Sequence, residues 1–139
     1  MDNKQLKVSD VMSACVSTLG RNDKLSIAED LMKQERIRHL PVINEDGHLC
    51  GIITQRDMFR GALVRALGFG SRAEDQILNT IAVKEAMTDK VQTTTPDTLL
   101  TEAAKLMIER KIGCLPVIDG GRLVGMLSEG DFVKLMTQQ

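Results

Sequence analysis

The chain consists of two copies of one sequence pattern, and this duplication restricts its fold more than any other feature. When the sequence is shifted by 75 positions, the LPVI segment at 40–43 falls on the LPVI segment at 115–118. One residue is then lost in a turn, and the GIITQRD segment at 51–57 meets GMLSEGD at 125–131. Matches that keep one register over so many positions indicate an internal repeat.

Each half opens with a lead-in segment of mixed polarity, VSDVM at 8–12 and VKEAM at 83–87. We expect each lead-in segment to form a helical turn. Short strands are then expected around Val16–Thr18 and Val91–Thr93, where apolar and β-branched residues follow one another.

An amphipathic helix is predicted next in each half, because apolar residues recur at helical spacing. In the second half, Thr95 and Pro96 predict the helix start, as a capping hydroxyl followed by a proline in the first turn. The apolar stripes, which we interpret as core, are Leu25, Ala28, Leu31 and Met32 in the first half and Leu100, Ala103, Leu106 and Met107 in the second.

Two strands joined by a tight turn follow in each half, at 39–43 and 49–54 in the first. Closing helices are expected over Gln55–Leu67 and Glu129–Met136. Between the halves, Gly68, Gly70 and Ser71 indicate a connector, and Asp75–Ala82 is a candidate short helix. The expected domains are therefore repeat 1 at 1–67, a connector at 68–82 and repeat 2 at 83–139.

Neither half, at about 55 residues, would easily form a stable core alone. We therefore expect an α/β (α+β) fold in which two pseudo-symmetric repeats pack sheet to sheet. That packing predicts a shared ligand cleft between the repeats, lined by the ends of the 51–57 and 125–131 segments.

These two segments carry the candidate site chemistry. Each has a glycine, two apolar residues, a hydroxyl residue (Thr54 or Ser128) and an aspartate three positions later (Asp57 or Asp131). One interpretation is purely structural, because a hydroxyl followed three residues later by an acid is a capping box. The other is a ligand site: the glycine recurs, and a glycine within a strand often marks close approach of another backbone or of a ligand.

A ribose suits this chemistry, because a carboxylate has two acceptor oxygens for two vicinal hydroxyls. A phosphate would be accepted at the nearby helix start if cations assist. Arg38 and His39 are the candidate cations in the first half, with a solvated charge and a structural histidine as the alternative. Gly113 and Cys114 occupy the matching positions in the second half.

Composition excludes several classes of function. The net charge of −1 and the absence of Trp and Tyr argue against nucleic-acid binding. The three cysteines form no metal-binding pair, and neither a nucleophile–base pair nor a phosphate-loop lysine motif is evident, so no metal site and no enzyme activity are expected. The polar N-terminus and the lack of an apolar run of about 20 residues predict a cytoplasmic protein without membrane contact.

The doubled pattern, a V-x-x-x-M lead-in, I-x-x-LPVI and G-L-x-G-h-h-[ST]-x-x-D (h, apolar), resembles a tandem pair of CBS (cystathionine β-synthase) domains, called a Bateman module. The resemblance covers nearly all of both halves. It implies two β-α-β-β-α repeats, further pairing into a homodimer, and binding of adenosine-containing ligands. AMP, ADP or ATP are the first expectation, with S-adenosylmethionine or NAD(H) in some members and no obligatory cofactor.

The resemblance also implies roles for individual residues. Asp57 and Asp131 would hold ribose hydroxyls, assisted by Thr54 and Ser128. Ile37 and Ile112 would pack on adenine, the segments near Val16 and Val91 would touch adenine through their backbone, and Arg38 and His39 would face phosphate. Gly113 and Cys114 depart from the basic type, which predicts one stronger and one weaker site. The implied function is a stand-alone regulatory module that reports energy or metabolite status to an unknown effector protein in trans. The alternative is a structural or dimerisation scaffold that binds no nucleotide.

Overall fold

The computed structural model describes residues 5–59 and 78–138, and the chain divides into two compact units. The first-repeat unit comprises residues 17–90. The second-repeat unit comprises residues 1–16 together with 91–139. The chain therefore passes between the units twice, after residue 16 and after residue 90.

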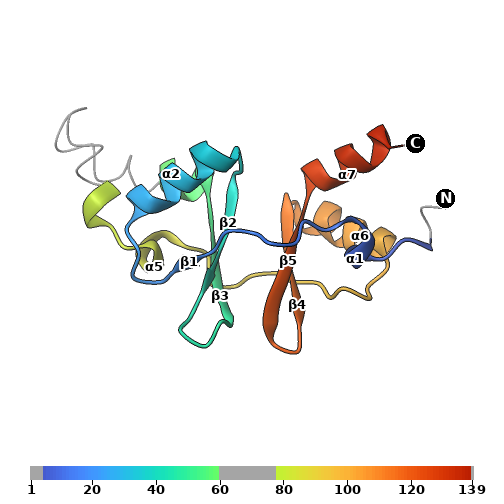
Figure 1. The fold of residues 1–139 in the computed structure, drawn as a ribbon, viewed down its shortest axis with the longest axis horizontal. Coiled ribbons are helices and arrows are strands. Elements are labelled where there is room, and N and C mark those ends of the chain that lie inside the picture. The colour runs from blue at the N-terminus through green and yellow to red at the C-terminus, as the bar shows by residue number, and fades with distance from the viewer. Residues whose placement is uncertain (1–4, 60–77, 139) are drawn as a thin grey trace. The chain divides into compact units, whose positions relative to one another are not determined.

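The first-repeat unit is a small sheet with helices (Figure 1). Its three strands are ordered β1-β2-β3, with β1 parallel to β2 and β2 antiparallel to β3. The helix that follows β3 is described over 55–59, and residues 78–80 are also helical. The other elements are β1 (Leu19–Gly20), α2 (Leu25–Glu35), β2 (His39–Ile43), β3 (Leu49–Thr54) and α5 (Val83–Ala86).

The second-repeat unit repeats this arrangement with a smaller sheet. Strands β4 and β5 are antiparallel, and Thr94 adds an isolated parallel bridge to Val117 where the first-repeat unit has β1. Its elements are α1 (Val8–Val11), α6 (Leu100–Arg110), β4 (Cys114–Asp119), β5 (Arg122–Ser128) and α7 (Glu129–Thr137). The order β-α-β-β-α expected from the sequence is thus present in both units, with one strand reduced to a bridge.

Each unit has its own apolar core on one face of its sheet. Leu40 and Ile53, paired across β2 and β3, are fully buried in the first core. Leu115 and Leu127 take the same places in the second. The predicted apolar stripes of α2 and α6 do pack into these cores: Leu25, Ala28 and Met32, with Leu31 partly buried, and Leu100, Ala103 and Met107, with Leu106 partly buried.

The lead-in segments are exchanged between the repeats. Helix α1 comes from the first half of the sequence but packs in the second-repeat unit, against α6 and α7 (Figure 1). Helix α5 comes from the second half but packs in the first-repeat unit, against β3. Val8 and Val83 are completely buried in these positions. Each compact unit therefore contains residues from both sequence repeats.

The exchange also explains how the amphipathic helices begin. The N–H of Leu100 donates to the carbonyl of Leu6 at 2.8 Å, and the N–H of Leu25 donates to the carbonyl of Ile81 at 2.9 Å. Neither α2 nor α6 has a side-chain cap. The backbone just before each exchanged lead-in segment therefore accepts hydrogen bonds that a capping hydroxyl would otherwise accept.

Three sequence predictions need correction. Strand β1 lies at Leu19–Gly20 rather than at Val16–Thr18, because buried Leu19 pairs with Val42. No strand forms at Val91–Thr93, and pairing there begins at Thr94. Thr95 and Pro96 precede α6 without capping it, since the Thr95 hydroxyl bonds to that of Thr98 at 2.7 Å.

The closing helix α7 agrees with the prediction to within one residue. The predicted helix Gln55–Leu67 is present over 55–59, and its remainder lies outside the described residues. Residues 68–77 of the predicted connector also lie outside the described residues. The same holds for residues 75–77 of the candidate helix Asp75–Ala82.

Candidate functional site

The junction after β3 is a reciprocal capping box. The backbone N–H of Thr54 donates to Oδ2 of Asp57 at 3.0 Å, and the N–H of Asp57 donates to the Thr54 hydroxyl at 3.0 Å. Asp57 is only half-buried. Within the described part of the chain, no hydrogen bond reaches its other oxygen, Oδ1. The capping interpretation is therefore correct as geometry, and one acceptor oxygen remains available.

The junction after β5 has more internal partners. Oδ2 of Asp131 accepts the backbone N–H of Ser128 at 2.9 Å and the Ser128 hydroxyl at 3.3 Å. Oδ1 accepts a third hydrogen bond, 2.7 Å long, from the hydroxyl of Ser13, which directly follows the exchanged lead-in segment. Only 5% of Asp131 is exposed. Both oxygens of this carboxylate are therefore engaged within the protein.

Sheet register brings the candidate cations of the first half to the Thr54 junction. His39 is directly opposite Thr54 in the β2–β3 pair, on the face opposite the core residues Leu40 and Ile53. The carbonyl of Arg38 accepts the N–H of Gln55 at 2.9 Å. In the second-repeat unit, Cys114 is opposite Ser128, and the Gly113 carbonyl accepts the N–H of Glu129 at 3.1 Å. The two junctions thus have the same backbone hydrogen-bonding pattern, but they differ in the charge of the neighbouring residues.

The recurring glycine is explained by close approach of backbone. A Cβ atom on Gly51 would lie 2.5 Å from Sδ of Met87 and 3.0 Å from the carbonyl oxygen of Thr88. On Gly125 it would lie 2.8 Å from the carbonyl oxygen of Ser13. The glycine could mark close approach of another backbone or of a ligand. In both units, close approach of the backbone that follows an exchanged lead-in segment explains why a glycine is present.

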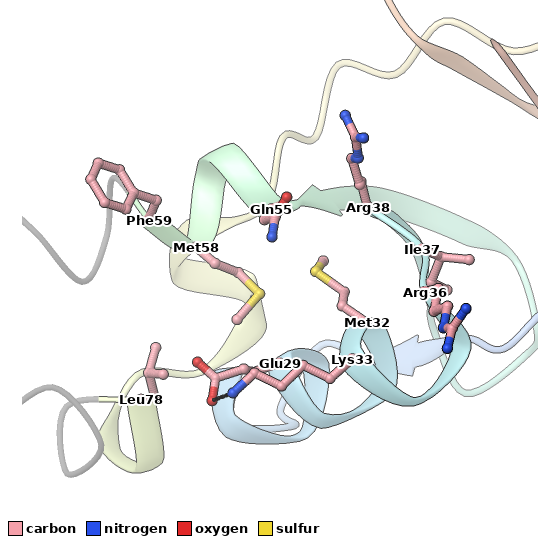
Figure 2. A pocket seen from close by; sticks show the side chains of 10 residues that line it. All are labelled: Glu29, Met32, Lys33, Arg36, Ile37, Arg38, Gln55, Met58, Phe59 and Leu78. Carbon is pink, nitrogen blue, oxygen red and sulfur yellow. Dashed lines mark hydrogen bonds and ion pairs between the residues drawn. The ribbon is translucent and has the colours of Figure 1, made fainter. Parts of the chain in front are cut away.

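Ile37 and Arg38 lie at a cavity of about 440 Å³ in the first-repeat unit. Figure 2 shows the side chains of Met32, Met58 and Gln55 converging on this cavity, while Arg38 points away from it. The Lys33 ammonium donates to Glu29 at 3.2 Å along its edge. Thr54, Asp57 and His39 are not part of its lining. Among the described residues, this cavity therefore includes Ile37 and Arg38 but not the Thr54 junction.

Ile112 lines the corresponding cavity of about 490 Å³ in the second-repeat unit. The side chains there are mainly apolar, with Ile108 and Phe132 at the positions of Lys33 and Met58. Ser128 and Asp131 do not line it. Val16 and Val91 are half-buried, and neither belongs to a strand or helix.

Ser13 is the site residue that sequence reasoning missed. Its signal was present, since Met12-Ser13 and Met87-Thr88 match at the same shift of 75 that defines the repeat. The backbone of both hydroxyl residues pairs with a β-strand: Ser13 with Met126 and Thr88 with Ile52. Only the contact across 118 residues of sequence separation reveals that one of them bonds to an aspartate.

The cysteines contribute no reactive centre at the Ser128 junction. Burial, reinforced by the negative charge of Glu129, raises the pKa of Cys114 to about 12. A thiol with so high a pKa is a poor nucleophile. Burial also raises the pKa of Cys50, although nearby Arg21 opposes the shift. All three cysteines are free thiols: Cys114 is buried, Cys50 is half-buried and Cys15 is exposed.

Among the described residues, no cluster of His, Cys, Asp and Glu is arranged to hold a metal ion. In the same part of the chain, no helix has the length and apolar character needed to cross a bilayer. What the junctions do offer is a hydroxyl, a carboxylate and a helix start in one place. That combination can bind vicinal hydroxyl groups of a ligand.

Comparison with known proteins identifies the two halves. The family model of the CBS domain matches residues 8–63 and again residues 83–138. The CBS domain-containing protein YhcV of Bacillus subtilis is 32% identical, over 89% of this chain and 81% of the relative. A homoserine O-acetyltransferase of Methanococcoides burtonii is 33% identical over 93% of this chain. The chain spans only about a quarter of that relative, 24% of its length.

Solved structures agree in fold. The crystal structure of CBSX2 in complex with AMP superposes with a TM-score of 0.77 and 28% identity, covering 95% of this chain and 96% of that one. The CBS domain pair of MJ0100, in complex with 5′-methylthioadenosine and S-adenosyl-L-methionine, gives 0.73 and 27%, covering 96% and 97%. With both repeats matched by the family model, the chain belongs to the CBS domain family and is a tandem CBS domain pair.

Proposed function

We propose that this CBS pair is a regulatory module that binds an adenosine-containing ligand and reports its level to a partner protein in trans. AMP, ADP and ATP are the first candidate ligands, followed by S-adenosylmethionine and NAD(H). A homodimeric, cytoplasmic module without catalytic activity is part of the same proposal. The adenosine compounds in the CBSX2 and MJ0100 structures support this ligand class.

The observation that carries the proposal is the half-used carboxylate of Asp57. Its Oδ2 closes the capping box, and among the described residues nothing occupies Oδ1. A capping box alone needs one oxygen, so the second is available to accept a ribose hydroxyl. Hydrogen bonds to a charged acceptor contribute about 1.5–3 kcal/mol, which is enough to select for the hydroxyl.

The neighbours of Asp57 suit the rest of a nucleotide. Arg38 and His39 adjoin the Thr54 junction through the β2–β3 register and the Gln55–Arg38 hydrogen bond, and Arg38 is exposed. Arg38 supplies a permanent positive charge for phosphate, and Ile37 supplies apolar surface for adenine. In this proposal, Thr54 assists Asp57, Val16 and Val91 touch adenine through their backbone, and Ser128, Asp131 and Ile112 form the second site.

A scaffold without ligand is the second candidate, and two observations favour it. Both aspartates form capping boxes, and both glycines are explained by the exchanged lead-in segments. If these roles were complete, the module would only present surfaces for pairing. The scaffold interpretation gives no role to Oδ1 of Asp57, which accepts no hydrogen bond within residues 5–59 and 78–138.

Thermal unfolding in the presence of AMP, ADP, ATP, S-adenosylmethionine or NADH separates the two. A ligand at 100 times its Kd stabilises the folded chain by about 2.7 kcal/mol, a rise in Tm of about 5–10 °C for a domain of this size. Asp57→Asn keeps a capping side chain but removes the charged acceptor, and it should reduce the rise. Asp30→Asn, an exposed carboxylate on α2, is the matched control. No rise with any compound, on protein freed of bound nucleotide, would favour the scaffold.

A further inference from the structure

The two aspartates of the repeat are equivalent in sequence and unequal in structure. Asp131 accepts three hydrogen bonds, including the 2.7 Å bond from Ser13, and only 5% of it is exposed. Asp57 is half-buried and, within the described residues, uses one oxygen. A ligand hydroxyl that approached Asp131 would have to share or displace the hydrogen bond that Oδ1 already accepts from Ser13, at a carboxylate with little exposed surface.

Ser13 and Thr88 hold the same place in the two units. Each exchanges two backbone hydrogen bonds, all of 2.9 Å, with a strand residue, Met126 or Ile52. The Ser13 hydroxyl nevertheless bonds to Asp131, whereas Thr88 is exposed and among the described residues makes no hydrogen bond to Asp57. A serine hydroxyl turns freely toward an acceptor, while the methyl group of threonine restricts the torsion angle χ1.

We propose that the Ser13 hydroxyl is an internal competitor for Asp131, which makes the Asp57 site fill first and holds the Asp131 site in reserve. This inference rests on the proposed adenosine binding. A ligand hydroxyl competes with the Ser13 hydroxyl for Oδ1 of Asp131, so its affinity there is reduced by the stability of the Ser13–Asp131 hydrogen bond. The charges act in the same direction, because Arg38 and His39 accompany Asp57 while Gly113 and Cys114 accompany Asp131.

Unequal sites have a regulatory consequence. A module with two equal sites responds over one range of ligand concentration. With Ser13 in competition, the first-repeat unit responds at low concentration and the second-repeat unit at a concentration about tenfold or more higher, since 1.4 kcal/mol is a factor of ten. Ser13 belongs to the first sequence repeat and Asp131 to the second. Ligand binding at the second site therefore depends on residues of both repeats.

The test titrates AMP by calorimetry into the full chain and five variants. Compared with wild type, the Asp57→Asn variant should lose the tight site. The Asp131→Asn variant should keep the tight site, with a change in its Kd of less than about twofold. Ser13→Ala should tighten the second site by about tenfold, so that Asp57→Asn with Ser13→Ala binds where Asp57→Asn alone does not. Thr88→Ala is the matched control and should leave both affinities unchanged.

A ligand-free measurement accompanies the titration. Ser13→Ala and Asp131→Asn, singly and combined, should change the unfolding equilibrium constant with a coupling factor of about tenfold. Additive effects, or a tight site lost with Asp131→Asn and kept with Asp57→Asn, would overturn the inference while adenosine binding stands. If neither wild type nor any variant binds AMP, ADP, ATP, S-adenosylmethionine or NADH, the proposed function fails and the inference fails with it.

Discussion

The carbonyl oxygen of Ser13 lies 2.8 Å from the point where a Cβ atom on Gly125 would be placed. Two backbone hydrogen bonds, each 2.9 Å long, hold Ser13 against Met126 at this spot. The lead-in segment therefore cannot retreat without breaking its pairing to β5. The glycine of the repeated junction is a condition for the exchange of lead-in segments.

Gly125→Ala should destabilise the protein by about 1–3 kcal/mol, because a fixed carbonyl has to move. Gly51→Ala should cost less, since its nearest contact is the flexible Met87 side chain. Gly130→Ala is the control: its Cβ would meet only the Ser128 hydroxyl at 3.7 Å, and a helical alanine should stabilise by about 0.5 kcal/mol. Urea unfolding measures all three, and equal losses for Gly125→Ala and Gly130→Ala would contradict the close-approach explanation.

Val8→Ala should weaken the second-repeat unit, although Val8 belongs to the first repeat of the sequence. The side chain is completely buried in the core with Leu100 and Leu115, and its truncation should cost about 2 kcal/mol. Hydrogen exchange followed by mass spectrometry should show faster exchange in α6 and β5. Val83→Ala is the matched variant and should accelerate exchange in α2 and β3 instead. Acceleration in α2 by Val8→Ala would contradict the exchanged arrangement.

Lys111→Gly should stabilise the protein by about 0.5–1 kcal/mol. Lys111 ends α6 in the left-handed conformation, with φ at 55°, where glycine is the favoured residue. Lys105→Gly in the exposed interior of α6 is the control, and it should destabilise by about 1 kcal/mol. Thermal unfolding reports both changes. A loss of stability with Lys111→Gly would contradict this prediction. It would show that contacts of the Lys111 side chain stabilise the fold by more than glycine gains in the left-handed conformation.

Stability should fall above pH 9 because of Cys114. Its thiol ionises near the ordinary pKa of 9.0 in the unfolded chain, but keeps its proton up to a pKa of about 12 when folded. The contribution is intact below pH 9 and is lost between pH 9 and about 12, at about 1.4 kcal/mol per pH unit. Urea unfolding of wild type and Cys114→Ala at pH 8 and pH 10.5 checks this. Parallel losses in the two proteins would assign the decline to other groups.

Arg38→Ala should weaken AMP binding by about tenfold and leave adenosine binding unchanged, if Arg38 faces phosphate as proposed. The loss should shrink as salt screens the exposed charge. Arg122→Ala, an exposed cation of β5, is the control. Equal weakening of AMP and adenosine would indicate that Arg38 supports the fold of the site rather than the phosphate. Calorimetric titration distinguishes these results.

Local patterns in the sequence were sufficient to predict most of the elements. The apolar stripes gave α2 and α6, and alternation with tight turns gave the paired strands, because these signals arise within a dozen residues. Thr95 and Pro96 misled the prediction of the α6 start, since the donors there are satisfied by the Leu6 backbone. A partner so distant in sequence leaves no local trace.

The candidate site was predicted only in part, for a related reason. The capping boxes at Thr54–Asp57 and Ser128–Asp131 follow from spacing alone, and both are present. The ligand roles of these residues stay predictions. The third partner of Asp131 depends on the exchange of lead-in segments, which periodicity cannot indicate because each lead-in looks alike in sequence.

The exchanged lead-in segments also bear on how such a chain could arise. A single repeat would lack the lead-in segment that packs beside its amphipathic helix. A second copy could supply that segment by domain swapping, in which two copies exchange their lead-in segments. In that assembly the missing piece would be available only in proportion to protein concentration. Tandem fusion makes the same contact intramolecular, so that each unit finds its complement at a fixed effective concentration, however dilute the protein.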